Sequence, residues 1–335
     1  MDSKLKNSTR LMDFLSLSPI IPVLFLLIMD PKSLMMAWNE GRGGLIFAAI
    51  FLLIEWMSVR GSLTFRLDRK RILIFSSSFF GISFFYALVY LWNFHERIAS
   101  TANILGIPGT LNWIWLWEYI VYAIFLILCL ISLFGKKGLR EFIVPIVYLF
   151  GTAAILLLDA LFPYNSLSFM AWFIPIIMGA VVFLLWISGI QVLKDFPMGN
   201  PPYVYVSQNL LFVKGNHGSI VLEINWPCIG VLSMLIYALL ITIIMIKLNA
   251  PLRRKIFYAS IGAVGTFFVN VFRVYLITWY TLFISVDVKI FHESIGEALF
   301  LAWIVAFLLI VMKVEMTILK SSSSPKEGPV SELPL

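Results

Sequence analysis

The sequence predicts an all-α multi-pass membrane protein with about eight transmembrane helices, one interfacial or re-entrant helix and a small extracytoplasmic β-hairpin. Composition gives the first reason, because 61% of the 335 residues are hydrophobic and only 13% are charged. Ordinary soluble proteins contain about 25% charged residues. The mean hydropathy is +0.95, so the apolar side chains are too numerous for one water-soluble core and must face lipid. A soluble fold is therefore excluded.

The second reason is a series of apolar runs near the length of about 17 to 25 residues that a bilayer-crossing helix needs. These runs cover residues 14–29, 44–59, 72–92, 113–134, 142–162, 169–192, 228–246, 256–284 and 295–312. Asp30-Pro31-Lys32 follows the first run directly, and no small-residue cleavage site separates them. We therefore interpret the first run as a retained helix rather than a signal peptide.

The third reason is the distribution of Lys and Arg, which mark cytoplasmic loops. Successive connections up to residue 168 carry 3, 2, 5, 1, 3 and 0 of them, so inside and outside alternate. The alternation fails only around residues 169–192, because residues 193–226 hold two basic residues and residues 247–255 hold four. We therefore predict that the run at 169–192 lies at the outer surface without crossing. Eight runs then cross the plasma (cell) membrane, both termini are cytoplasmic, and residues 163–226 are external.

Within this external segment, residues 209–214 and 219–224 are β-rich and are joined by Gly215-Asn216-His217-Gly218, a pattern typical of a β-hairpin. The sequence thus indicates three parts. They are N-terminal transmembrane helices over residues 1–141, a core over residues 142–312 with an external hairpin region at 203–226, and a disordered cytoplasmic tail over residues 313–335.

Cys228 is a candidate nucleophile, because it lies at or near the first turn of its predicted helix, at the outer end. The positive end of a helix dipole favours a thiolate there. The alternative is that Cys228 is simply a small buried apolar residue. Cys129 fits that alternative well, since it lies within a continuous apolar run near the predicted cytoplasmic end.

Arg273 is the one Lys or Arg that falls inside an apolar run. A guanidinium in the membrane costs at least about 2.5 to 3.5 kcal/mol on insertion scales, which makes an intramembrane arginine a functional hypothesis. The alternative is an arginine that extends its charge to the outer headgroups. Asn270 lies three residues earlier on the same helical face, where its amide can orient the guanidinium.

His292 lies in the predicted short outer loop before the last helix, and its near-neutral pKa range suits proton transfer. His95 and His217 are also external in this topology, and His217 in the hairpin is a competitor for the same role. A nucleophile, a fixed cation and an acid/base on one membrane face are what attack on an amide requires.

Three segments carry a resemblance to a known family: Pro227-Cys228-Ile229-Gly230, Asn270-Val271-Phe272-Arg273 and Phe291-His292-Glu293-Ser294-Ile295-Gly296. In their order of Cys, Arg and His they resemble the exosortase/archaeosortase family of multi-pass membrane cysteine transpeptidases. The similarity covers roughly residues 145–312. Pro227 and Ile229 depart from the small residues that many bacterial members carry beside the cysteine. The length of 335 residues is more similar to that of an archaeal member than to that of a bacterial member with a fused soluble domain.

The resemblance implies an eight-helix fold whose external face carries Cys228 as the nucleophile, Arg273 as the thiolate or oxyanion partner and His292 as the acid/base, with Asn270 in support. It also implies the partners. These are exported surface proteins with a C-terminal motif, a hydrophobic helix and a basic cluster, together with an acceptor such as a membrane lipid.

Two alternatives from other functional classes stay open. One is a small anion permease or channel that uses Arg273, although the polar groups gather near one surface rather than along a path. The other is an assembly subunit without chemistry. We expect no cofactor, metal or nucleic-acid partner, because no matching motif occurs and the net charge of +7 is explained by topology. Glu297 either pairs with Arg273 or caps the last helix.

Overall fold

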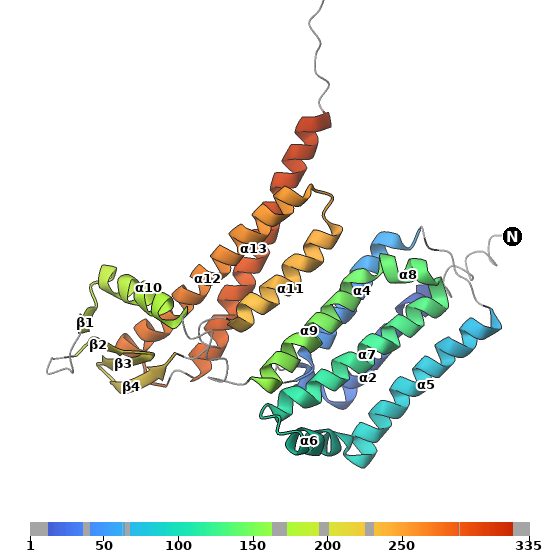
Figure 1. The fold of residues 1–335 in the computed structure, drawn as a ribbon, viewed down its shortest axis with the longest axis horizontal. Helices are drawn as coiled ribbons and strands as arrows, with labels where there is room; N and C mark the ends of the chain where they lie inside the picture. Colours follow the sequence, from blue (N-terminus) through green and yellow to red (C-terminus); the bar gives the residue numbers. More distant parts are fainter. Residues whose placement is uncertain are drawn as a thin grey trace, which may run out of the picture. The chain divides into compact units, whose positions relative to one another are not determined.

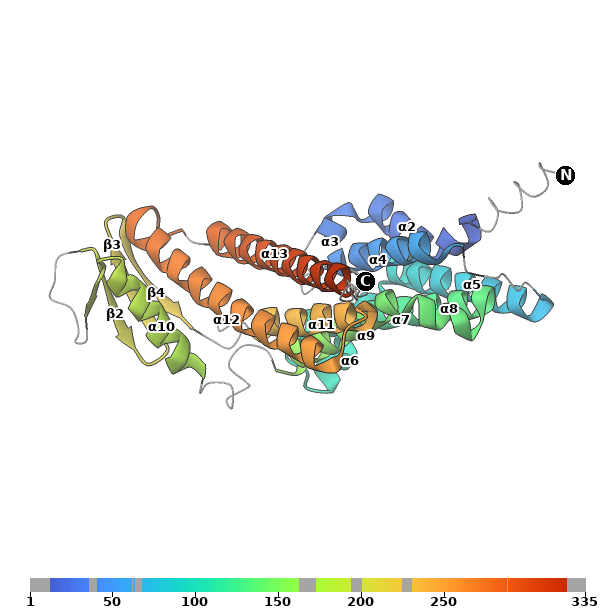
Figure 2. The same cartoon turned by 90° about the horizontal axis from the view of Figure 1, so that it is seen from above.

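The computed structural model describes residues 13–35, 41–61, 63, 68–162, 173–193, 201–224, 231–287 and 289–323. The chain divides into two compact units, Met1–Leu167 and Ser168–Leu335 (Figures 1 and 2). The helix at 143–161 packs with the helices that precede it and belongs to the first unit. The predicted boundary after residue 141 between the N-terminal helices and the core stays a prediction.

Unit 1 is a bundle of helices. They are η1 (Ser18–Ile20), α2 (Ile21–Met29), α3 (Pro31–Met35), α4 (Gly43–Val59), α5 (Arg69–Trp92), α6 (Phe94–Ile104), α7 (Thr110–Phe134), α8 (Lys136–Glu141) and α9 (Ile143–Leu161). Helix α7 is the centre of this bundle and contacts α5, α6, α8 and α9. Its buried face is lined by large side chains such as Tyr119, Tyr122, Leu126 and Leu130.

Two glycines lie at close contacts with the neighbours of α7. A Cβ atom at Gly44 would lie 2.1 Å from the Tyr119 hydroxyl, so this side chain of α7 occupies the space beside Gly44 in α4. At the start of α7, the Gly109 N–H donates to the Ala160 carbonyl at 2.9 Å. A Cβ atom at Gly109 would lie 2.5 Å from the Cα atom of Ala160, which ties the start of α7 to the end of α9.

Unit 2 contains the helices α10 (Ile174–Ile187), α11 (Val231–Lys247), α12 (Leu252–Phe283) and α13 (Lys289–Ser323), and the strands β1 (Gln191–Leu193), β2 (Tyr203–Ser207), β3 (Leu210–Gly215) and β4 (Gly218–Glu223). The strands form one sheet in the order β1-β2-β3-β4, in which β1 and β2 are parallel and the other pairs antiparallel.

The predicted hairpin is confirmed as β3–β4, which turns at Asn216 and His217. The strands β1 and β2 were not predicted, so the sheet is larger than expected. The turn between β2 and β3 places Gln208 at a φ of 55°, a conformation that glycine or asparagine usually marks in a sequence and glutamine does not.

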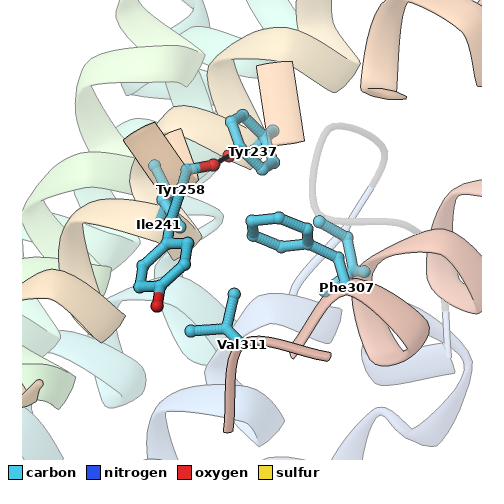
Figure 3. Packing of buried hydrophobic residues seen from close by; sticks show 6 residues of the cluster. Tyr237, Ile241, Tyr258, Phe307 and Val311 are labelled. Carbon is cyan, nitrogen blue, oxygen red and sulfur yellow. Dashed lines mark hydrogen bonds between the residues drawn. The ribbon is translucent and has the colours of Figure 1, made fainter. Parts of the chain in front are cut away.

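Helices α11, α12 and α13 pack side by side, with α12 in contact with both others (Figure 1). Gly262 lies against the Tyr237 hydroxyl and Gly265 against the Trp303 ring, each closer than a Cβ atom would allow. Tyr237 donates a hydrogen bond to the Ala259 carbonyl at 2.9 Å. A cluster of buried side chains holds the three helices together (Figure 3), namely Tyr237, Ile241, Tyr258, Ile304, Phe307 and Val311.

Among the described residues, five helical segments are long and apolar enough to cross a membrane: Arg69–Trp92, Thr110–Phe134, Ile143–Leu161, Leu252–Phe283 and Ala298–Ile318. Four shorter apolar helices, Asp13–Met29, Gly43–Val59, Ile174–Ile187 and Met234–Lys247, coincide with the other predicted runs. The chain is therefore a mostly helical membrane protein with a small four-stranded sheet, and the count of eight crossings stays a prediction.

The last helix corrects one expectation. We predicted that it ends near residue 312 and that a disordered tail begins at 313, but α13 continues to Ser323. Residues 313–323 include Val314, Met316 and Ile318, which keep the apolar character of the helix beyond Lys313. Glu315 also accepts hydrogen bonds from Arg254 and Tyr258 of α12, and these contacts tie the extended helix to its neighbour.

Candidate functional site

Helix α12 carries two of the predicted site residues. Asn270 is 4% exposed and Arg273 is half-buried. Their spacing of three residues places them on the same side of the helix. The predicted placement of both residues on one helix is confirmed, whereas their catalytic roles stay predictions.

The other two site residues fall at the edges of described segments. Cys228 lies outside the described residues, and α11 is described from Val231 onward. We expected His292 in a loop, but α13 begins at Lys289, so His292 is in the first turn of that helix. The side chains of His292 and Glu297 lie outside what the structure describes.

Chain topology nevertheless brings the three elements to one end of unit 2. Short connections link α11 to α12 and α12 to α13, so neighbouring helices run in opposite directions. Arg273 lies about 31 Å along α12 from Leu252, and Val231 lies about 24 Å along α11 from Lys247. The end of α12 that holds Arg273 is therefore the end at which α11 and α13 begin.

A side-chain contact between α12 and α13 gives the level of His292 in the same way. The Trp303 indole of α13 donates to the Thr266 hydroxyl of α12 at 3.1 Å. From this contact, Arg273 is about 10 Å and the His292 backbone about 16 Å further along, toward the same end of the helices. The two predicted residues are thus about one helical turn apart in height.

The β3–β4 turn packs on the carboxyl end of α12. The Asn216 backbone N–H donates to the Leu282 carbonyl at 3.2 Å, which satisfies a helix-end acceptor that has no partner within α12. A Cβ atom at Gly215 would lie 2.3 Å from that carbonyl oxygen, so the turn needs glycine there. His217 therefore lies at the end of α12, and it stays a competitor for the acid/base role.

Helix α10 attaches the sheet to the same half of α12. The Ser188 and Tyr275 hydroxyl groups form a hydrogen bond of 2.8 Å between α10 and α12, two residues after Arg273. With 14 residues, α10 is about 21 Å long, shorter than the hydrocarbon core of about 30 Å. This length agrees with the predicted helix that does not cross the membrane. Its location at the outer surface stays a prediction.

Unit 1 contains a buried ion network that the sequence did not predict. Arg42 is 2% exposed and Glu118 is fully buried, and the guanidinium donates two hydrogen bonds of 2.8 Å to the carboxylate. Arg42 also donates to Asp30 at 2.9 Å and to the Tyr90 hydroxyl at 3.0 Å. His95 contacts Glu118 at 2.7 Å. The network thus joins the end of α2, the start of α4, the end of α5, the start of α6 and the first half of α7.

The charge of Arg42 is secured by its surroundings. Burial alone would lower the pKa of Arg42, but the Glu118 carboxylate attracts and hydrogen-bonds the guanidinium and raises its pKa above the ordinary value. The Trp115 ring lies 5.2 Å from the guanidinium carbon. In the sequence, Arg42 is one of the two basic residues on the second connection, and Glu118 lies within the apolar run at 113–134. Their pairing joins positions 76 residues apart, so local pattern carries no signal for it.

Cys129 is a buried residue, as the sequence indicated. It is fully buried in α7, and its sulfur lies 3.3 Å from the Ser78 hydroxyl of α5. It occupies a packing position in unit 1, whereas Cys228 belongs to the sequence of unit 2.

In a comparison with protein-family models, the model described as transmembrane exosortase matches residues 38–309. The match begins well before residue 145, where the resemblance in the sequence begins, and includes most of unit 1. No curated protein matches the chain. No solved structure matches it either.

Proposed function

Because the chain belongs to the transmembrane exosortase family, we propose that it is a membrane-embedded cysteine peptidase and transpeptidase. It cleaves the C-terminal sorting signal of exported surface proteins and transfers the new C-terminus to an acceptor such as a lipid. The observation that carries the proposal is the family match over residues 38–309, which includes all three segments with the Cys, Arg and His.

In the proposed reaction, the Cys228 thiolate attacks the carbonyl carbon of the scissile amide, and Arg273 stabilises the negative charge on the carbonyl oxygen. The C–N bond then breaks, His292 gives a proton to the leaving amine, and a thioester with Cys228 remains. An acceptor hydroxyl or amine attacks this thioester, transfers its proton to His292 and releases the thiolate. The proton and the thiolate are both restored at the end of the cycle.

The packing of unit 2 supports this assignment. Arg273 lies on the helix in contact with both α11 and α13, and the heights of Arg273 and His292 along the helices agree to about one turn. Asn270 is buried one turn below Arg273, where an amide oxygen can accept from the guanidinium and hold its direction. Membership of an archaeal subgroup stays a prediction, because the family match does not distinguish archaeal from bacterial members.

Processing can be measured directly. We would co-express the chain with an exported protein that ends in a short motif, a hydrophobic helix and a basic cluster, and determine the mass of the substrate's C-terminus. We expect a truncated C-terminus, with added acceptor mass, only when the chain carries Cys228. Identical C-termini with the wild-type chain and with Cys228→Ala would refute the proposal.

The proposed topology has eight crossings, both termini in the cytoplasm and residues 163–226 outside the plasma membrane. Reporter fusions after Asn165 and after Met198 are both expected to report an external location, because the segment between them does not cross. Fusions after Lys137 and Arg254 serve as cytoplasmic controls. Opposite locations for Asn165 and Met198 would contradict the eight-crossing topology.

The permease alternative receives less support from unit 2. Ion and solute sites in transporters are commonly built where a helix is broken near the middle of the membrane. Helix α12, which carries Arg273, is continuous over its 32 residues. Its charged groups lie toward the two ends, with Arg253, Arg254 and Lys255 at one and Arg273 nearer the other.

A further inference from the structure

The corner between α5 and α6 in unit 1 is built as a fixed angle. Helix α5 ends at Trp92, and Asn93 adopts the left-handed conformation with a φ of 48°. The Asn93 N–H donates to the Leu88 carbonyl, which closes the last turn as helix-terminating residues commonly do. Helix α6 begins immediately at Phe94 and lies across the ends of α5 and α7 (Figure 1).

Both sides of this corner are held by the buried ion network. Tyr90, in the last turn of α5, accepts from Arg42, and His95, at the start of α6, contacts Glu118. The Phe85 and Phe94 rings pack edge to face across the corner at 6.2 Å. The walls of the corner therefore keep their positions without any contribution from a ligand, which lowers the entropy lost when one binds.

A groove of about 340 Å³ lies in this corner, lined by Leu88, Trp92, Phe94 and Arg97. Three of its lining side chains are apolar or aromatic, and the fourth is a cation. Arg97 is exposed and, within the described part of the chain, makes no ion pair. Its neighbour Glu96 is also exposed, but adjacent residues of a helix point in different directions.

The groove lies at the level of lipid headgroups. Helix α5 begins with Arg69, Lys70 and Arg71 and contains 24 residues. It is therefore about 36 Å long and exceeds the hydrocarbon core of about 30 Å. With the basic start of α5 at one membrane surface, Trp92 and Arg97 lie at the other. Trp92, which is 58% exposed, is typical of that interfacial region.

We propose that this corner is a binding site for an anionic phospholipid of the leaflet at this end of α5. The phosphate contacts the Arg97 guanidinium, and an acyl chain lies along Leu88 and Trp92. The first turn of α6 borders the groove at Phe94, and the positive end of its helix dipole favours the same sign of charge. An apolar wall below a single cation matches a molecule with a chain below an anionic headgroup. Lipid binding here is independent of the processing activity.

The test measures lipid binding to the purified full-length chain in detergent. Native mass spectrometry would compare phosphatidylglycerol with phosphatidylcholine of identical acyl chains, added over the same concentration range. We expect the wild-type chain to bind phosphatidylglycerol about fivefold more tightly, since one cation near a membrane surface is worth about 1 kcal/mol toward an anionic lipid. Arg97→Gln removes this preference, whereas Arg97→Lys retains most of it.

Arg60 supplies the matched control. It is exposed and lies 5.6 Å from the Trp56 ring, so it is also an arginine beside a tryptophan but outside the groove. Arg60→Gln is expected to keep the wild-type preference. Trp92→Ala is expected to lower the affinity for both lipids, because it removes the apolar wall and not the charge. Circular dichroism and gel filtration confirm that each variant is folded.

Three results would overturn the proposal: equal binding of both lipids by the wild-type chain, an unchanged preference in Arg97→Gln, or an equal loss of the preference in Arg60→Gln. If Trp92→Ala binds both lipids with unchanged affinity, the groove does not bind the acyl chain, and Arg97 acts only as a surface charge. None of these outcomes bears on cleavage of exported proteins, which depends on residues of unit 2.

Discussion

The two units use buried charge to different extents. In unit 1, Arg42 and Glu118 are both buried and neutralise each other, and the network around them joins five segments. In unit 2, the ion pair between Arg254 and Glu315 joins only α12 and α13, and its arginine is 34% exposed. The predicted chemistry-bearing residues belong to unit 2. The difference teaches that buried charge alone does not mark a reactive site, since unit 1 uses it to join helices.

The strongest test of this contrast uses the two cysteines, one from each unit. Cys228→Ala is expected to abolish processing, because loss of the nucleophile in a comparable catalytic group costs about a million-fold in rate. Cys129→Ala is expected to retain processing, since Cys129 is fully buried against Ser78 in unit 1. The measurement is the mass of the substrate's C-terminus at equal amounts of inserted protein.

A second test separates the histidines of unit 2. His292→Ala is expected to slow turnover about 100- to 10,000-fold, the usual range for loss of a general acid, while substrate binding persists. His217→Ala is expected to leave the rate largely intact. The reverse pattern would assign the proton transfer to the β3–β4 turn, which the structure places at the end of α12.

A third test concerns the cation of α12. Arg273→Ala is expected to lower the rate about 100- to 1,000-fold, as loss of an oxyanion donor does. Arg273→Lys is expected to be nearly as damaging, because lysine keeps the charge but loses the planar fork of donors. Near-normal processing by Arg273→Lys would instead favour an arginine that only extends to the headgroups. Arg253→Lys, at the opposite end of α12, is the matched control.

A fourth test moves to unit 1 and predicts a stability effect in place of a catalytic one. Glu118→Ala leaves Arg42 buried without its bidentate partner, and breaking a buried ion pair costs about 3 to 5 kcal/mol. We expect a lower thermal unfolding temperature in detergent and less inserted protein. The rate per folded molecule is expected to stay at the wild-type value, and a selective loss of rate would give the network a role in chemistry.

Sequence patterns predicted features that depend on neighbouring residues. The apolar runs, the hairpin at residues 209–224 and the placement of Asn270 with Arg273 follow from helical or strand periodicity, and the structure contains each of them. The family resemblance, based on three short segments, is confirmed by a match that covers both units.

Features that depend on distant contacts were missed. The ion network joins residues from five segments, and β1 pairs with β2 across residues 194–200, which the hairpin pattern does not reach. The length of α13 was also missed, because the apolar run ends before Lys313. Glu315 lies beyond that point and pairs with Arg254 of α12. This contact between separate helices stabilises the last turns of α13, and a local pattern does not reveal it.

The smallest expected effect distinguishes the members of the ion network from one another. His95 is 24% exposed, whereas Glu118 is fully buried, so water can replace the imidazole more readily than it can replace the carboxylate's arginine partner. His95→Ala is therefore expected to cost about 1.5 to 3 kcal/mol, the range for one hydrogen bond to a charged group, and less than Glu118→Ala. Thermal unfolding of the two single variants and of the double variant measures the coupling. If the network acts as one unit, the double variant will lose less stability than the sum of the single losses, because the His95 contact is already absent once Glu118 is removed. Strict additivity would show that His95 stabilises the start of α6 without acting through Glu118, and the corner between α5 and α6 would then depend on Tyr90 and Arg42 alone.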